Sequence, residues 1–317
     1  MLLYLLKRLL YVAPIAFGVT VVCFSLVHLA PGDPLNAVAG ADAPTDVVEM
    51  LRSAYGFDRP LIEQYWIWIS RVLQGDLGLS IATNRSVADE LARALRNTLI
   101  LALAAALIGF VIGSVLGAIA GYLNGSLADK AITAFAVAGV SVPHYWLGIV
   151  LVIIFSVELG WLPSFGAGPG SSDLWHPDLD HLRYLVLPAF TLSVIPMGVV
   201  MRTVRALIAE TLNQDFVQAL RAKGLREFTV FLHVLRNAAP TALAVIGLQF
   251  GYLLGGSILV ETVFSWPGTG FLLNMAIFQR DLPLLQGTIL VLAMFFVVLN
   301  LLVDVIQTAI DPRIKRT

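Results

Sequence analysis

Charged residues are scarce in this chain of 317 residues. They make up 13% of the sequence, and 58% of the residues are hydrophobic, whereas an ordinary soluble domain carries about 25% charged residues. The mean hydropathy is +0.84. This composition excludes an ordinary water-soluble globular protein, so the natural unit to count is the membrane span.

Cysteine and an excess of positive charge are also lacking. The single cysteine, Cys23, lies in an apolar run, which excludes an intrachain disulfide and a cysteine-based metal cluster. The chain has 20 Lys and Arg against 21 Asp and Glu, for a formal charge of −1. No bulk positive charge therefore points to nucleic acid.

Nucleotide-binding and catalytic motifs are missing as well. There is no G-x-x-x-x-G-K-[ST] sequence for a P-loop. The five histidines show no H-E-x-x-H spacing, and Ser193 has no nucleophile elbow around it. We therefore predict that the chain is not an enzyme and holds no metal or cofactor of its own.

Long uncharged apolar stretches are what the sequence has instead. A helix needs roughly 20 apolar residues to cross a bilayer, and six stretches without Asp, Glu, Lys or Arg qualify. Lys7 and Arg8 precede the first, whose length and lack of an A-x-A-like cleavage site favour an uncleaved span over a signal peptide. We predict an all-α polytopic membrane protein whose six transmembrane helices cover residues 9–30, 99–123, 131–157, 184–201, 237–260 and 282–303.

The distribution of basic residues predicts the orientation, because cytoplasmic flanks carry the excess of Lys and Arg. We place residues 1–8, 202–236 and 304–317 in the cytoplasm. The connections that cover residues 31–96, 158–183 and 261–281 lie outside. Twelve of the twenty basic residues then fall on the cytoplasmic side: Lys7, Arg8, Lys130, Arg202, Arg205, Arg221, Lys223, Arg226, Arg236, Arg313, Lys315 and Arg316.

The 31–96 region is too long for a simple connection and shows two amphipathic helix patterns. The first runs from a cap at Thr45 or Asp46 to Gly56, and the second from Pro60 to Gly75. Aromatic residues on the second suit the outer membrane interface. A small cap packed over the helix bundle explains both patterns at least as well as direct contact with a substrate.

Two of the predicted spans carry glycines at four-residue spacing, which lets helix backbones approach closely in lipid. These stripes indicate helix packing and no chemistry. They comprise Gly109, Gly113, Gly117 and Gly121 in the second span, and Gly247, Gly251 and Gly255 in the fifth.

Residues 202–236 are too polar to cross the bilayer and read as a helical hairpin. One half covers 215–224, the other covers 226–236, and Gly224 supplies the turn. A DNA-binding hairpin is disfavoured because both its ends are fastened to membrane spans. Two interpretations remain open, a basic hairpin resting on anionic lipid and a docking element for a cytoplasmic partner.

This hairpin resembles the signature loop of ABC importer permeases. The pattern of that loop is Glu-Ala-Ala, followed by any three residues and then Gly. Gln218-Ala219-Leu220 stands at the Glu-Ala-Ala positions and Gly224 at the glycine, and the chain departs from the pattern at Gln218 and Leu220. Further stretches match, in order, the first permease subunit of dipeptide and oligopeptide ABC importers. They lie at 31–34, 75–80, 141–146, 159–163, 221–224, 235–238, 260–268, 303–304 and 311–314.

The resemblance implies a type I ABC importer permease fold in a bacterial inner membrane, with di- or oligopeptides as cargo. It also implies a second permease, two ATPase subunits that hold ATP and magnesium, and an external substrate-binding protein. Phe216, Ala219 and Leu220 would anchor the hairpin in an ATPase, with Arg221 and Lys223 at the rim. The implied coupling residues are Asp215, Phe216, Gln218, Ala219, Leu220, Arg221, Ala222, Lys223, Gly224 and Leu225.

A proton-coupled secondary transporter of small solutes is the alternative, because ionisable residues inside spans are functional suspects. Glu158, Glu261 and Asp304 are candidates for such a role, but all three fall at predicted span ends. His144, beside Pro143, is the one titratable group placed near the middle of a span. Structural roles are favoured for each, and His144 with Ser141 is also a candidate for the transport pathway.

Overall fold

Helices make up most of the described chain. The structure, a computed structural model, describes residues 13–25, 44, 46, 49, 50, 58–170, 172 and 174–310, with the backbone alone at 254 and 302–310. Within these residues there is no strand, only an isolated bridge between Leu79 and Ser86. The two termini, the 31–34 stretch, most of the helix predicted over 45–56 and the side chain of Asp304 lie outside the described part.

Four helices are long and apolar enough to cross a membrane: Val87–Tyr122, Leu179–Leu212, Glu227–Leu253 and Leu282–Leu301. A bent pair of helices brings the number to as many as five. For the first predicted span, 9–30, the structure describes the helix Ala13–Ser25, which is too short by itself to cross. The structure is thus consistent with the six predicted spans.

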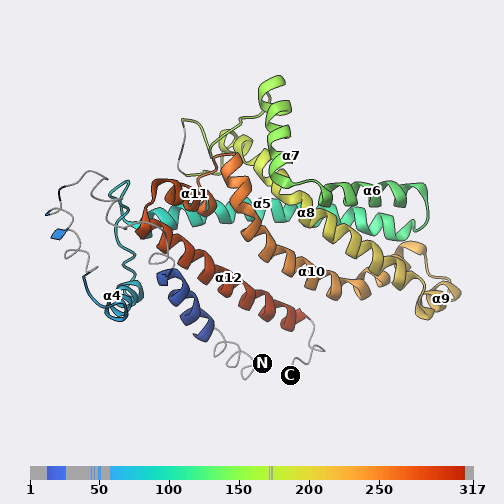
Figure 1. The fold of residues 1–317 in the computed structure, drawn as a ribbon. Helices are drawn as coiled ribbons and strands as arrows, with labels where there is room; N and C mark the ends of the chain where they lie inside the picture. Colours follow the sequence, from blue (N-terminus) through green and yellow to red (C-terminus); the bar gives the residue numbers. More distant parts are fainter. Residues whose placement is uncertain are drawn as a thin grey trace. The chain divides into compact units, whose positions relative to one another are not determined.

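The span predicted over 131–157 is not one straight helix. Helix α6 covers Leu127–Ser141, α7 covers His144–Leu151, and the π-helix η1 continues over Val152–Glu158. The two halves meet at 99°, and Figure 1 shows α6 and α7 leaving their junction in different directions. Pro143 explains the break, since it lacks an N–H and pushes the residue before it out of the helical region.

The predicted cytoplasmic hairpin is also built differently. Helix α8 (Leu179–Leu212) continues well past the predicted end of its span, and α10 (Glu227–Val263) begins before its own span and passes through it. Between them stands one separate short helix, α9 (Asp215–Ala222). The second half of the hairpin is therefore the first part of a long helix, because no glycine or proline interrupts 227–239.

The predicted outer loop at 261–281 holds a helix. α10 runs on to Val263, and α11 (Thr269–Gln279) follows after a short turn. Arg280, in the left-handed region at φ 53°, ends α11, and α12 (Leu282–Ile310) starts two residues later.

The described chain divides into two compact units. The first comprises residues 1–96 and 268–301, and the second comprises 97–267 and 302–317. Helix α5 (Val87–Tyr122) starts in the first unit and continues in the second.

In the first unit, a buried carboxylate ties the 75–80 stretch to the start of α12. Asp281 is fully buried; its side chain accepts hydrogen bonds from the Ser80 hydroxyl and from the backbone N–H of Ala82 and Leu284. Asp281 thereby caps α12 and holds a loop distant in sequence. Helix α4 (Leu61–Leu73) forms as predicted, and its Tyr65 hydroxyl lies 2.7 Å from the Thr20 hydroxyl.

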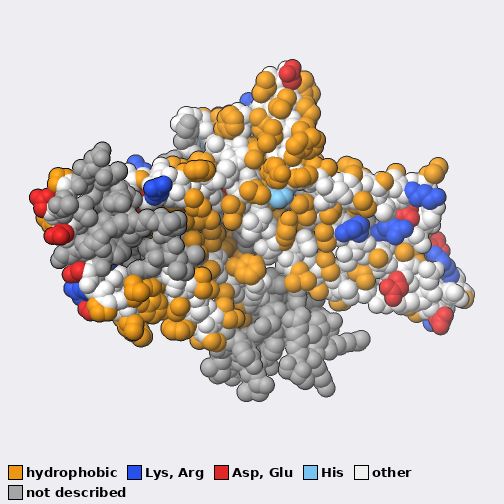
Figure 2. Space-filling model, in the orientation of Figure 1, with side chains coloured by type: hydrophobic (Ala, Val, Ile, Leu, Met, Phe, Trp, Pro, Cys, Tyr) orange, Lys and Arg blue, Asp and Glu red, His pale blue; other side chains and the backbone are white. Residues whose placement is uncertain are grey.

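In the second unit, α8 lies at the centre, and α5, α6, α7 and α10 pack against it. Asp178 caps its first turn by accepting the N–H of His181. Figure 1 shows α8 and α10 running together toward the end that carries α9. In Figure 2 hydrophobic side chains cover much of the visible surface around α6 and α7, whereas charged ones gather near α9.

Candidate functional site

The separate helix α9 is the candidate site, and its end is shaped by Gly224. Gly224 adopts φ +77°, where its N–H bonds the carbonyl of Arg221 at 2.9 Å and the N–H of Leu225 bonds that of Leu220 at 3.3 Å. This pair of bonds is the Schellman motif, which ends helices at a left-handed residue. The geometry turns the chain sharply into α10.

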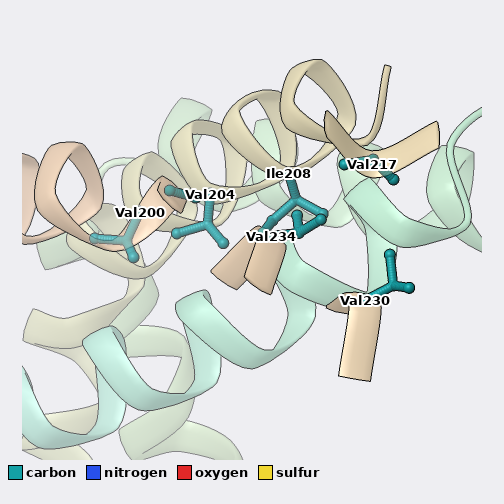
Figure 3. Packing of buried hydrophobic residues seen from close by; sticks show 7 residues of the cluster. Val200, Val204, Ile208, Val217, Val230 and Val234 are labelled. Carbon is teal, nitrogen blue, oxygen red and sulfur yellow. The ribbon is translucent and has the colours of Figure 1, made fainter. Parts of the chain in front are cut away.

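One face of α9 is packed into the chain's own core. Val217 is completely buried and meets residues of both neighbouring long helices (Figure 3). Phe216, Leu220 and Leu225 are partly buried against the same cluster. The cluster consists of Val200, Val204 and Ile208 from α8, Val217 from α9, and Val230, Val234 and Ala238 from α10.

The packing of α9 involves two of the three anchors that the resemblance implies for an ATPase. Phe216 and Leu220 are partly buried against the chain's own helices. The apolar face of α9 packs against α8 and α10 of the same chain. Exposing this face to water would lose the free energy gained by its burial. Of the three implied anchors, Ala219 is exposed, whereas Val217, which is not among them, is completely buried.

The outward face of α9 is small and polar. Gln218, Ala219 and Ala222 are exposed there, as are Asp215 and Lys223. Small side chains at the centre of an exposed face allow close approach of another surface, and the amide of Gln218 adds a hydrogen-bonding group.

An ion pair closes the base of the α9 turn. Arg221 Nε donates to Glu227 Oε1 at 3.0 Å and Nη2 donates to Oε2 at 3.1 Å. These bonds raise the pKa of Arg221 further above its usual value. Both side chains are about half exposed, so the pair adds little stability; its consequence is geometric, since it fixes the direction of Arg221.

A second ion pair joins α6 to α8. Arg205 Nη2 donates to Asp129 Oδ2 at 2.8 Å, and its Nε donates to Oδ1. Asp129 also accepts the N–H of Gly125, and its side chain is 2% exposed. The bidentate geometry holds the α5–α6 turn against the part of α8 that leads to α9.

The two candidate pathway residues flank the break between α6 and α7. The Ser141 hydroxyl donates to the carbonyl of Val137 within α6. His144 opens α7, and its Nε2 is buried and has no hydrogen-bond partner within the part of the chain that the structure describes. The structure therefore brings both residues to one break in a span and shows Ser141 already engaged within its own helix.

The carboxylates weighed for proton coupling are placed differently. Glu158 is exposed, whereas Glu261 is fully buried and accepts a hydrogen bond from the Thr98 hydroxyl at 2.8 Å. Beside Thr98, the Asn97 amide donates to the carbonyl of Pro267 and the Trp266 indole donates to that of Asn97. Glu261 thus belongs to a buried hydrogen-bonded network, which hydropathy alone does not reveal.

The glycine stripe of α5 lies directly against α8. A Cβ placed on Gly109, Gly113, Gly117 or Gly121 would lie 2.5 to 2.9 Å from a carbonyl oxygen of α8. The other stripe differs: Gly251 is buried, Gly247 is half-buried, and Gly255 is exposed, where such a Cβ would have no packed neighbour within 4 Å in the described part of the chain.

No group of three or more His, Cys, Asp or Glu able to hold a metal ion occurs among the described residues. Helix α9 has one face packed into the chain's own core and one exposed face.

Comparison with known proteins gives matches over nearly the whole chain. Residues 113–316 match the family model "Binding-protein-dependent transport system inner membrane component", and residues 1–102 match the N-terminal model of such membrane components. The "Glutathione transport system permease protein GsiC" of Escherichia coli K12 and that of Shigella dysenteriae serotype 1 are each 42% identical over 316 residues, covering 99% of both chains.

A solved structure shares the fold. An inward-facing conformation of the MetNI methionine ABC transporter superposes with a TM-score of 0.56 at 19% sequence identity, covering 70% of this chain and 96% of that one. Together with the sequence matches, this likeness does not favour a proton-coupled secondary transporter.

Proposed function

The chain belongs to the family of binding-protein-dependent transport system inner membrane components, the permease subunits of ABC importers, and on that premise we propose that it carries small peptides and couples to ATPases through α9. It works beside a second permease, beneath an external substrate-binding protein and above two ATPase subunits. Its termini and α9 face the cytoplasm. Hydrolysis of ATP takes place in the partner subunits.

The proposed cargo is di- and oligopeptides, with glutathione among them. Support comes from relatives named for glutathione transport that match along almost the entire chain. The spans contain few ionisable groups, which suits a solute recognised through its amide and carboxylate groups rather than through one fixed counter-charge.

The observation that carries the coupling proposal is the burial of Val217 between α8 and α10. Because α9 is packed against both long helices, a push on its outward face reaches both of them directly. Closure of the ATPases would then tilt α8 and α10 together, as a rigid-body switch. If α9 were not packed against α8 and α10, the same force would move α9 alone.

Substitution of Ala219 by arginine should prevent ATPase docking while leaving the chain folded. Ala219 is exposed on the outward face, so the larger side chain can extend into solvent in the free chain and would obstruct a close contact with a partner. Loss of one central contact at an interface reduces affinity by about 30-fold. The measurement is the amount of ATPase that co-purifies with the chain in mild detergent.

Ala206→Arg is the matched control, because Ala206 is also exposed but lies on α8. It should retain the ATPases at the wild-type level. Equal retention by both variants would mean that the outward face of α9 is not the docking surface.

Transport itself is tested with labelled glutathione and a labelled dipeptide in cells with and without this permease. Uptake should require the chain, disappear when ATP is depleted, and persist when a protonophore dissipates the proton gradient at clamped ATP. Uptake that follows the proton gradient instead would contradict the importer mechanism. If neither peptide is taken up, the proposed cargo is contradicted but the importer mechanism is not.

A further inference from the structure

The helix α5 has two opposite faces of different character. One is the glycine face that packs on α8. The other faces away from the protein and bears large aliphatic residues at four-residue spacing, between 43% and 68% exposed. We call this second face the α5 stripe; it consists of Leu103, Leu107, Val111, Val115 and Ile119.

The composition of the α5 stripe suits lipid better than another helix. Helices associate in membranes through small residues and polar side chains, which permit close backbones and interhelical hydrogen bonds. The α5 stripe has neither, and its branched and extended side chains resemble acyl chains in chemistry. Its natural neighbour is therefore the hydrocarbon of the bilayer.

At its end toward α9, the α5 stripe leads into a groove between α5 and α10. The groove has a volume of about 410 Å³. The rings of Tyr122 and Phe231 meet edge to face across the two helices, 5.4 Å apart, and Phe228 is 72% exposed. The residues lining the groove are Ala118, Ile119, Tyr122, Leu123, Glu227, Phe228 and Phe231.

Charge distinguishes the mouth of the groove from its walls. Glu227, the charged residue in the lining, has its carboxylate engaged by Arg221, so its negative charge is compensated. Arg226 directly precedes it, Lys223 lies in the same turn, and both are exposed. An apolar groove beside two exposed cations complements a molecule with a hydrocarbon chain and an anionic head.

We propose that the groove between α5 and α10 binds an anionic glycerophospholipid of the inner leaflet, with one acyl chain against Ile119, Leu123 and Phe228 and the phosphate beside Arg226 and Lys223. The inner leaflet follows from the cytoplasmic placement of α9 in the proposed function. The α5 stripe makes the groove continuous with the hydrocarbon of the bilayer, so that the chain enters from the membrane.

Photocrosslinking tests this proposal on the intact importer complex. The complex is reconstituted into vesicles of equal parts phosphatidylglycerol and phosphatidylcholine, with p-benzoylphenylalanine in place of Phe228. A second preparation carries the same group in place of Phe135, a residue of α6 that is 57% exposed and does not line the groove. After illumination, mass spectrometry identifies the adducts.

At position 228 the adducts should favour phosphatidylglycerol over phosphatidylcholine by about fivefold, which is the effect of one basic residue near a headgroup. The ratio should be larger if both Lys223 and Arg226 contribute. At position 135 the ratio should be close to one. Adding Lys223→Gln and Arg226→Gln should bring the ratio at 228 to the value at 135. These three results together would support the site.

Two results would overturn it. Adducts mainly with a polypeptide at 228 would make the groove a protein interface, and equal lipid ratios at 228 and 135 would make it ordinary contact with bulk lipid. Both leaflets of the vesicles have the same composition, so neither result depends on which way α9 faces. Failure of the proposed function appears separately, in the peptide-uptake assay.

Discussion

Replacing Gly224 with valine is expected to uncouple ATP hydrolysis from transport. The glycine holds φ +77° at the end of α9, and a β-branched residue in that conformation costs about 1–3 kcal/mol. Relief of this strain would open the Schellman turn and release α9 from the direction in which, under the proposed function, it docks with an ATPase. Peptide uptake by the reconstituted complex should fall roughly tenfold or more, while the spans remain folded.

The cause of this loss can be isolated at the same position. Apart from the residues next to it in the chain, a Cβ on Gly224 would have no described atom within 4 Å, so overlap with a packed neighbour is not the reason that valine fails. Asparagine adopts the left-handed conformation more readily than other side chains, and Gly224→Asn should keep most of the uptake. Wild-type uptake by a fully assembled Gly224→Val complex would show that the turn does not transmit the ATPase motion.

A structural feature can be predicted from this sequence where its signal lies within a few neighbouring residues. Gly224 is recognisable as a helix terminator, and the α5 glycines as a packing face, because each depends on a short spacing along one element. The direction in which α9 turns its apolar face depends on α8 and α10 instead. Hence helical spacing marks Phe216 and Leu220 as residues of an apolar face, whereas their packing against α8 and α10 does not follow from that spacing.

Buried polar pairs were the hardest features to foresee. Asp129 with Arg205, and Ser80 with Asp281, join residues far apart in the chain, and no spacing rule links them. The break beside Pro143 could be predicted in part. Proline signals that a helix is interrupted, but the 99° between its halves depends on how both pack on α8.

The glycine face of α5 gives the second large expected effect, on folding. A Cβ at Gly117 would lie 2.5 Å from the carbonyl oxygen of Met201 and 2.9 Å from the Cβ of Val204. The first of these atoms is helix backbone and cannot rotate away, so α5 and α8 would have to separate. Since α8 lies at the centre of its unit, separation there loosens the support of α9 as well.

Gly117→Val should therefore lower the apparent melting temperature of the detergent-solubilised chain by roughly 5 °C, taking overpacking at about 1–3 kcal/mol, and reduce its yield from the membrane. Gly255→Val is the control, because Gly255 is exposed and a Cβ there would have no packed neighbour within 4 Å among the described residues. Both changes add the same β-branched side chain to a long helix, so their intrinsic helix propensities cancel in the comparison. Equal melting temperatures for the two variants would mean that α5 and α8 can move apart without loss, and that the four aligned glycines do not hold the bundle together.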